Sequence, residues 1–335
     1  MKAVFIPKEN FPKVLERWLS SYEILGPVER YGEIVLQPLT KESLKDVRLG
    51  ENRASISIKP LFLPQTECMF VYKSEPLKVE IDSSKPVPTL VLGVRACDLK
   101  AIELLDKVLL EEPADFYYLE KRKNTFLISV DCEEPLDVCF CALVGVNPYP
   151  ERGFTINLSK LEGGYLAEPG DEKGAELFEQ VKEFTIEATP EHFSPREERR
   201  RALLEKFKGE RLKELEKKIL SRDERYWEEL SKRCIQCGGC AFVCPTCYCF
   251  YVIDKRMSPE DWLRERGWDS CLFEAYQRMT SGENPRKTLA SRLVQRFNHK
   301  CVYFKEQYGE YMCVGCGRCI EVCPGRIDIR EILEE

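Results

Sequence analysis

The spacing of apolar residues in the first part of the chain alternates between helical and extended patterns. Residues 11–20 have helical spacing and predict a short amphipathic helix. Residues 31–81 hold short apolar stretches interrupted by prolines, which indicates strands and loops without readable boundaries. The apolar run at 89–94 predicts a buried strand. Helical spacing over 99–110 then predicts a helix, for which Asp98 is the expected N-cap.

A second buried strand is predicted at 125–130, so that strand, helix and strand follow one another as in an α/β fold. A cysteine follows each strand: Cys97 comes after the first and Cys132 after the second. Open α/β sheets place their sites at the carboxyl ends of the strands. We therefore expect these cysteines to lie close together, and we expect the start of the helix to favour the thiolate of Cys97.

The chain continues with a hairpin pattern at 154–158 and 165–167 and an amphipathic helix near 175–184. Charged residues dominate 195–232, where an apolar stripe with helical spacing predicts one long helix or two, with Gly209 as a candidate break. A solvated connecting helix is the favoured interpretation of this segment, ahead of an element that binds nucleic acid or a membrane.

The composition is that of a globular protein, with 43% hydrophobic and 32% charged residues among 335. No signal-peptide pattern is present, and no apolar run approaches the ~20 residues of a membrane span, so a cytoplasmic location is expected. The net charge of −6 argues against non-specific binding of nucleic acid. Only His192 and His299 are present, which leaves little room for histidine-based metal sites or triads. Seventeen cysteines in a reducing compartment indicate metal binding.

Eight of the cysteines form two runs with the same spacing, C-x2-C-x2-C-x3-C-P. Bacterial ferredoxins with two [4Fe–4S] clusters have this spacing, and the fourth cysteine of each run there binds the other cluster. We therefore expect crossed ligation. The expected ligands of one cluster are Cys234, Cys237, Cys240 and Cys323. The expected ligands of the other are Cys313, Cys316, Cys319 and Cys244.

These patterns together predict an α+β protein with several domains. We expect an α/β domain over 1–191, a charged helical connector over 192–232 and a ferredoxin-like two-cluster domain over 233–335. The last domain contains an insertion at about 250–312. Within this insertion, 288–297 is expected to form a helix whose basic residues are exposed.

Nine cysteines remain outside the two runs (17 − 8 = 9). Four of them fall in the α/β domain and make a complete ligand set for a third cluster: Cys97, Cys132, Cys139 and Cys141. The alternative is that these four are packing and loop residues. Three others make an incomplete set and are less favoured as further ligands: Cys247, Cys249 and Cys271. The isolated Cys68 and Cys301 are expected to be small buried packing residues.

Five motifs follow one another in a recognisable order: Gly93-Val94-Arg95-Ala96-Cys97-Asp98, Cys132 with Cys139-Phe140-Cys141, Cys244-Pro245-Thr246-Cys247-Tyr248-Cys249, Trp268-Asp269-Ser270-Cys271 and Cys316-Gly317-Arg318-Cys319. This order resembles the iron–sulfur beta subunit of cytoplasmic sulfhydrogenases and the iron–sulfur electron-transfer subunit of anaerobic sulfite reductases. It is also similar to the matching subunit of flavin oxidoreductases that serve heterodisulfide reductase. The resemblance covers roughly residues 90–330.

The resemblance implies an iron–sulfur subunit that relays electrons between a flavin subunit handling NAD(P)H and a catalytic subunit of hydrogenase, sulfite or sulfur reductase, or heterodisulfide reductase type. The residues themselves agree with a relay, because the chain has no G-x-G-x-x-G loop and no nucleophile with a recognisable base. No catalytic residue is therefore predicted. Two alternatives stay open: a reductase in its own right that uses an unusual cluster, and a zinc-dependent interaction or nucleic-acid module.

Overall fold

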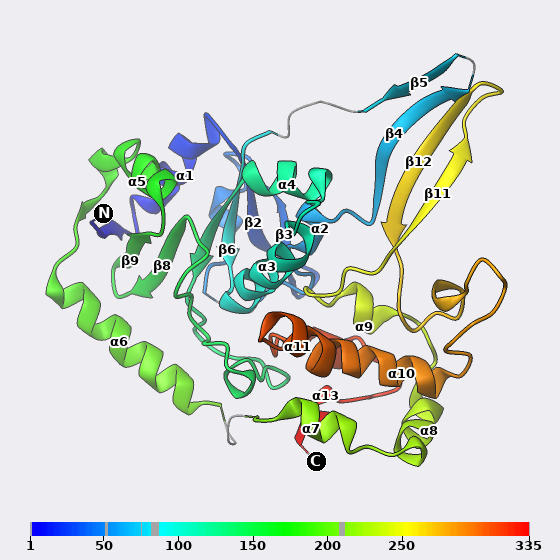
Figure 1. The fold of residues 1–335 in the computed structure, drawn as a ribbon. Helices are drawn as coiled ribbons and strands as arrows, with labels where there is room; N and C mark the ends of the chain where they lie inside the picture. Colours follow the sequence, from blue (N-terminus) through cyan, green and yellow to red (C-terminus); the bar gives the residue numbers. More distant parts are fainter. Residues whose placement is uncertain (1, 51–52, 75, 82–86, 208–211, 335) are drawn as a thin grey trace.

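An eight-stranded sheet dominates the amino-terminal half of the computed structural model, which describes residues 2–50, 53–74, 76–81, 87–207 and 212–334. The strand order is β10-β1-β9-β8-β7-β6-β2-β3 (Figure 1). The strands are β1 (Val4–Pro7), β2 (Glu23–Arg30), β3 (Glu33–Pro38), β6 (Thr89–Val94), β7 (Thr125–Val130), β8 (Ile156–Leu161), β9 (Gly164–Pro169) and β10 (Ile186–Glu187). Four adjacent strands, β2, β6, β7 and β8, are parallel, and the outer strands pair antiparallel. The predicted strands at 89–94 and 125–130 are confirmed as the neighbours β6 and β7.

Helices cover both faces of this sheet. One face carries α1 (Phe11–Leu19) and α5 (Glu172–Glu179), and the other carries α2 (Lys59–Phe62), α3 (Ala96–Leu109) and α4 (Phe116–Lys123). Side chains of a strand alternate between the two faces, so Leu90 and Leu92 pack in the core with α1 while Val91 packs in the core with α3. The second core continues through Phe304 and Met312 into the carboxyl-terminal half. The two halves therefore share one apolar interior.

The start of α3 differs from the sequence-based prediction. The helix begins at Ala96 with Arg95 as its N-cap, so Asp98 lies in the first turn and the prediction that Asp98 is the N-cap is wrong. The physical reason is a stronger partner for the carboxylate. Asp98 accepts two hydrogen bonds from the buried guanidinium of Arg318, at 2.7 and 2.9 Å.

The other predicted elements of this half are mostly present. The helix at 11–20 is α1, and the hairpin at 154–158 and 165–167 is the antiparallel pair β8 and β9. The helix expected near 175–184 is shorter, because α5 ends at Glu179 and a separate 3-10 turn follows at Lys182–Phe184. The other 3-10 turns are Leu44–Asp46, Ala142–Val144 and Ala275–Gln277.

The segment predicted as a connector contains three helices among its described residues instead of one or two: α6 (Pro190–Glu205), α7 (Leu215–Leu220) and α8 (Glu224–Arg233). The start of α8 is fixed locally, because the Asp223 carboxylate accepts a hydrogen bond from the Tyr226 amide at 2.8 Å. The expected break at Gly209 lies outside the described residues. The helix α6 packs against β8 and extends along one side of the molecule toward α7 (Figure 1).

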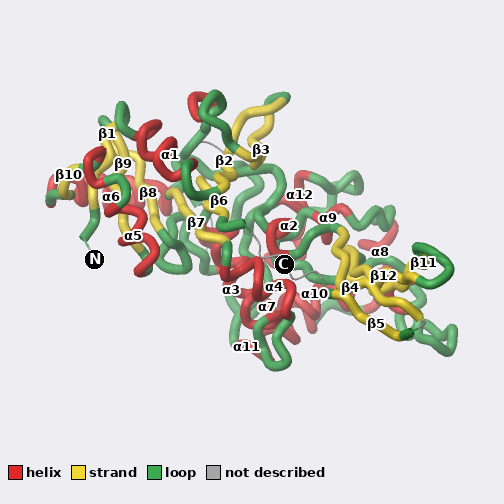
Figure 2. The backbone as a smooth tube through the Cα atoms, turned by 90° about the horizontal axis from the view of Figure 1, so that it is seen from above, coloured by secondary structure: helices red, strands yellow, loops and turns green. Residues whose placement is uncertain are grey.

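A second sheet has the antiparallel order β11-β12-β4-β5 and stands away from the main body (Figure 1). Its strands are β4 (Thr66–Ser74), β5 (Leu77–Glu80), β11 (Phe250–Arg256) and β12 (Asp261–Trp268). Figure 2 shows this sheet at the end of the molecule opposite β10. The hairpin of β11 and β12 belongs to the expected insertion. Its pairing with β4 joins two segments that the sequence analysis assigned to different domains.

The carboxyl-terminal half is otherwise helical. It contains α9 (Gly239–Phe242), α10 (Leu289–Asn298), a π-helical turn (His299–Tyr303), α11 (Phe304–Tyr308), α12 (Arg318–Glu321) and α13 (Ile329–Glu334). The helix predicted at 288–297 is confirmed as α10. The expectation that its basic residues are exposed is wrong, since Arg292 and Arg296 are buried. None of the described helices is long and apolar enough to cross a membrane.

A buried ion triad attaches the second sheet to the main body. Arg266 of β12 pairs with Glu67 of β4 and with Asp115, whose side chain also caps α4. The side-chain exposures of Arg266 and Glu67 are only 7% and 9%. Removing Arg266 leaves Asp115 without the cation that it pairs with, whereas Glu67 keeps an ion pair with Lys121.

We predict that Arg266→Met lowers the free energy of unfolding by about 3 kcal/mol, because two carboxylates lose their shared cation. Anaerobic denaturant titration followed by circular dichroism measures this change. The matched control is Arg264→Met, also in β12, whose ion pair with Asp254 is largely exposed and is worth less than about 1 kcal/mol. Equal effects of the two substitutions would contradict the structural role of the triad.

Candidate metal centres

The first cysteine run begins at the end of α8 and extends through α9, which contains Cys240, to Cys244 beyond it. Cys234 is the C-cap of α8, and Gly238 is the N-cap of α9 with φ +73°. One cavity at this place is lined by five cysteines, namely Cys234, Cys237, Cys240, Cys319 and Cys323, between apolar walls that include Leu272, Leu293 and Phe297. The structure therefore brings Cys323, from the second run, to the first three cysteines of the first run.

The second run has the same local construction. Gly317 is the N-cap of α12 with φ +73°, as Gly238 is for α9. The fourth cysteine of the first run, Cys244, lies close enough to influence the pKa of Cys313, Cys316 and Cys319. Each run thus has the last cysteine of the other run as its neighbour, which is the grouping that crossed ligation requires.

The amino-terminal cysteines form a third group. Cys97 lies in the first turn of α3, Cys132 follows β7, and Cys139 and Cys141 lie on the loop beyond it. All four line one cavity, together with Arg53, Arg95, Gly315 and Cys316. The parallel pairing of β6 and β7 explains this convergence, because it sets the two strand ends side by side.

The third group lies directly against the second run. The Phe140 amide donates a hydrogen bond to the Gly315 carbonyl at 2.8 Å, and the Cys139 thiol lies 3.9 Å from the Cys316 carbonyl. Such an approach needs glycine. A Cβ on Gly317 would lie 2.3 Å from the Val138 carbonyl oxygen. The two cysteine loops are therefore in backbone contact.

Burial raises the pKa of several of these thiols, whereas the pKa of Cys244 is lowered, chiefly by its hydrogen bond with Cys247. Burial raises the pKa of Cys313 to about 11, and it raises the pKa of Cys97 well above its usual value, with the carboxylate of Asp98 adding to the effect. The expectation that the helix start favours the Cys97 thiolate is therefore wrong for the chain by itself, because burial and the Asp98 carboxylate both raise the pKa of this thiol. A metal ligand must be deprotonated, so a metal held by these residues would stabilise their thiolate forms through its positive charge.

The donor sets fit iron–sulfur clusters. The three sets consist of thiols alone, they come in groups of four or five, and the cavities are mostly apolar. A cubane cluster takes four cysteine thiolates, and burial tunes its potential. The residues in place are thus suited to hold [4Fe–4S] clusters, which supply one-electron transfer when bound.

A protein family described as a 4Fe-4S dicluster domain matches residues 233–327. The sulfhydrogenase 2 subunit beta of Pyrococcus furiosus is 32% identical over 340 residues, which cover 100% of this chain and 98% of that protein. The chain belongs to the sulfhydrogenase beta-subunit family. A second relative is the F420-dependent formate dehydrogenase subunit beta of Methanocaldococcus jannaschii, 23% identical over 96% of this chain and 73% of that protein. This member of the sulfhydrogenase beta-subunit family is therefore an iron–sulfur protein of the electron-transporting oxidoreductase type.

A further set of three cysteines in this family member lies beside the first run. The thiols of Cys249 and Cys271 hydrogen-bond one another, and Cys247 contacts Cys244. Cys249 and Cys271 thus form one pair, and Cys247 forms another with Cys244, which already belongs to the first run. Among the described residues, no further thiol completes a separate set of four. Cys301 is fully buried, which confirms its predicted packing role, whereas Cys68 in β4 is exposed and the prediction for it is wrong.

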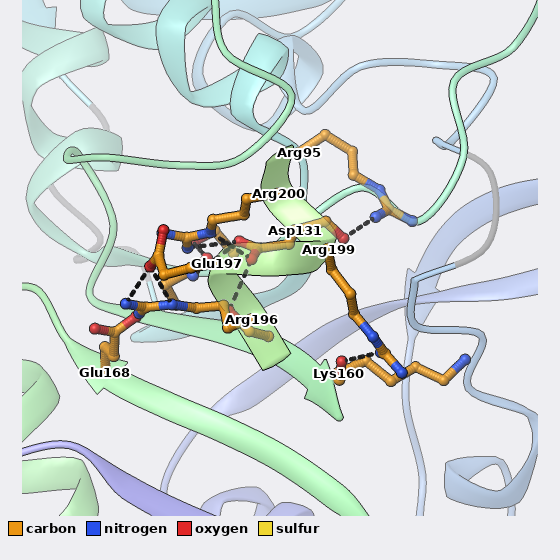
Figure 3. A network of polar contacts seen from close by, with 11 residues as sticks. Arg95, Asp131, Lys160, Glu168, Arg196, Glu197, Arg199 and Arg200 are labelled. Carbon is orange, nitrogen blue, oxygen red and sulfur yellow. Dashed lines mark hydrogen bonds and ion pairs between the residues drawn. The ribbon is translucent and has the colours of Figure 1, made fainter. Parts of the chain in front are cut away.

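Asp131 is a site residue that the sequence analysis missed. It lies between the end of β7 and Cys132, and Figure 3 shows it at the centre of a polar network. Its carboxylate accepts hydrogen bonds of 2.8–3.0 Å from Asn157, Ser159 and Arg200. Its carbonyl oxygen accepts one from Arg95 at 2.9 Å. Asp131 therefore joins α6 to the sheet edge that carries Cys132. An acidic residue directly before a cysteine at a strand end was the available signal.

This sulfhydrogenase beta-subunit family member also holds Arg53 and Arg318 in places that the sequence does not reveal. Arg318 is 1% exposed and joins α12 to α3 through Asp98. Arg53 donates a hydrogen bond to the Cys316 carbonyl at 2.8 Å and pairs with Glu321. Both arginines fix the second run against the amino-terminal half.

We predict that Gly317→Ala disrupts iron binding at the second and third groups, because the new methyl group would collide with the Val138 backbone. Iron per chain after anaerobic purification measures the loss. Gly309→Ala is the matched control: Gly309 has a similar φ of +75°, and its Cβ would meet nothing within 4 Å. That variant is expected to cost about 1–2 kcal/mol of stability and to keep its iron. Full iron content in Gly317→Ala would contradict the close approach of the loops.

Proposed function

We propose that this chain is an electron-transfer subunit that relays electrons through three [4Fe–4S] clusters. The proposed end points are a flavin subunit that handles NAD(P)H and a catalytic subunit of hydrogenase or reductase type. The names of both relatives describe beta subunits of redox enzymes, which supports the assignment to a multi-subunit complex. A reducing cytoplasm is the proposed location, since the ligands are buried thiols.

The proposed ligand sets are the following. The first cluster takes Cys234, Cys237, Cys240 and Cys323, and the second takes Cys313, Cys316, Cys319 and Cys244. The third takes Cys97, Cys132, Cys139 and Cys141. Four thiolates complete the shell of each cubane.

The contiguity of the three groups is the observation that carries the proposal. Cys319 belongs to the second set and also lines the cavity of the first. Cys316 belongs to the second set and also lines the cavity of the third. The three sets therefore form a row with the second in the middle, and a row of neighbouring one-electron centres is what a relay needs. A structural role would not require the groups to share walls.

A partner surface is available on the second sheet. Its two outer strands, β5 and β11, expose apolar side chains that include Leu77, Val79, Val252 and Ile253. Exposed apolar side chains gathered on one sheet are typical of subunit interfaces. The sheet stands away from the main body (Figure 1), which leaves its outer strands available to another subunit.

We predict that Cys316→Ser abolishes NAD(P)H-linked turnover of the purified complex, because the middle cluster loses a ligand. Reduction of a dye by the catalytic subunit should persist in the same preparation, since that reaction does not need the relay. Cys301→Ala, which changes a buried cysteine outside the three proposed ligand sets, should leave both activities unchanged. The relay fails as an explanation if the isolated chain turns over NAD(P)H and a sulfur acceptor without partners. That result would support the alternative of a reductase.

We predict about twelve irons per chain in the anaerobic wild type and about eight in Cys141→Ala, because a cubane that loses a ligand is expected to be lost. Iron analysis and electron paramagnetic resonance of the reduced protein measure this difference. Cys301→Ala is the control for burial, because Cys301 is fully buried and belongs to none of the three sets. About eight irons in the wild type, with no loss in Cys141→Ala, would rule out the third cluster.

A further inference from the structure

We propose that Lys300 is a fixed positive charge that raises the reduction potential of the second-run cluster, with Arg296 as its counterpart beside the first-run cluster. This inference rests on the ligand sets proposed above. Neither residue is a ligand. Lys300 would act through the Cys244 sulfur and Arg296 from the wall of the first-run cavity, and their effects would appear in a potential and not in the iron content.

The two cations come from one face of the helical segment after the insertion. Arg296 is in α10, and Lys300 follows four residues later in the π-helical turn. Residues at this spacing lie on the same side of a helix. Their exposures are 5% and 3%, so both reach inward to the loop of Cys244 and Cys247.

The polar contacts of Lys300 are with neutral oxygens and one sulfur. Its ammonium group donates to the Thr246 hydroxyl and the Met312 carbonyl, both at 3.0 Å, and lies 3.3 Å from the Cys244 sulfur. Cys244 is a proposed ligand of the second-run cluster. Among the residues that the structure describes, no carboxylate forms an ion pair with Lys300.

Arg296 has a similar environment beside the cysteines of the first run. One guanidinium nitrogen donates to the Cys240 carbonyl at 3.0 Å, and another lies 3.7 Å from the Cys247 sulfur. Cys240 is a proposed ligand of the first-run cluster. Over the described ranges, Arg296 also lacks a carboxylate at ion-pair distance.

Two buried cations without carboxylates need another source of negative charge. Moving an ammonium or guanidinium group out of water costs several kcal/mol unless an opposite charge compensates it. Cysteine thiolates that bind a cluster supply this negative charge permanently. The cations and the sulfur sites are therefore electrostatic partners.

Such a cation changes the redox equilibrium in a defined direction. Reduction adds one negative charge to a cluster, and a fixed positive charge close to a ligand sulfur stabilises the reduced state more than the oxidised state. The effect is strong in an interior of low dielectric constant. Arg318 offers a contrast, because Asp98 neutralises its charge through two hydrogen bonds, and its influence on the same cluster should be smaller.

The experiment is an anaerobic redox titration of the full chain, followed by electron paramagnetic resonance. A Cys323→Ala background removes a proposed first-run ligand, so that the second-run signal is easier to follow. Lys300→Met should lower the equilibrium constant for reduction of this cluster at least tenfold, which is 59 mV for one electron. Lys300→Arg, which keeps the charge, should restore most of it. Lys305→Met, which removes a half-buried lysine paired with Glu216, should cause no shift.

The outcomes separate the proposals. An unchanged potential in Lys300→Met with full iron content overturns the inference and leaves the relay intact. Cys323→Ala should lose the irons of the first-run cluster. If it loses those of another cluster instead, the proposed ligand sets are overturned. Lys300→Gln keeps a hydrogen-bonding group and tests the charge if the methionine variant does not assemble. If both neutral variants lose the cluster while Lys300→Arg keeps it, the charge serves assembly and not the potential, and the inference is overturned.

Discussion

The ion pair between Arg318 and Asp98 is the contact on which the arrangement of the sulfur groups depends. Its two side chains are 1% and 4% exposed, so the charges are almost completely removed from water. Two parallel hydrogen bonds compensate this cost and also fix the relative orientation of α12 and α3. The first of these helices carries Cys319 and the second carries Cys97. One buried pair thereby sets the distance between the second and third sulfur groups.

The relative position of the second and third sulfur groups also depends on contacts between backbone segments. The loops of the second run and of Cys139–141 touch main chain to main chain at Gly315 and Gly317, with no side chain between them. The sulfur groups lie between apolar walls that belong to the shared cores. The contact between the two loops, the orientation of α12 relative to α3 and the exclusion of water from the sulfur groups therefore have separate structural causes. These are the glycine backbone, the buried ion pair and the apolar cores.

The sequence predicted the local features and the grouping of the cysteines, and it missed the other long-range contacts. The strands β6 and β7 and the helix α10 follow from apolar spacing, and the cysteine runs follow from a fixed spacing within twelve residues. The convergence of Cys97 and Cys132 followed from the rule that parallel strands end at one sheet edge. The pairing of β4 with β12 was not readable, because β-pairing partners far apart in the chain leave no periodic signal in either strand. Arg296 was assigned to the surface because charge normally favours it, whereas in the structure it is buried beside the Cys247 sulfur and the Cys240 carbonyl.

The second sheet can be completed only late in the synthesis of the chain, because two of its paired strands lie far apart in the sequence. β4 pairs with β12 from Lys73↔Asp261 onward, a separation of 261 − 73 = 188 residues. At a translation rate of roughly 10 residues per second, β4 leaves the ribosome about 20 seconds before its partner strand exists. During that interval the only neighbour that the described strands of this sheet offer to β4 is the short strand β5. The second cysteine run is also made after β12, and its last member, Cys323, belongs to the proposed first-run ligand set, so that set is the last to be completed in the nascent chain.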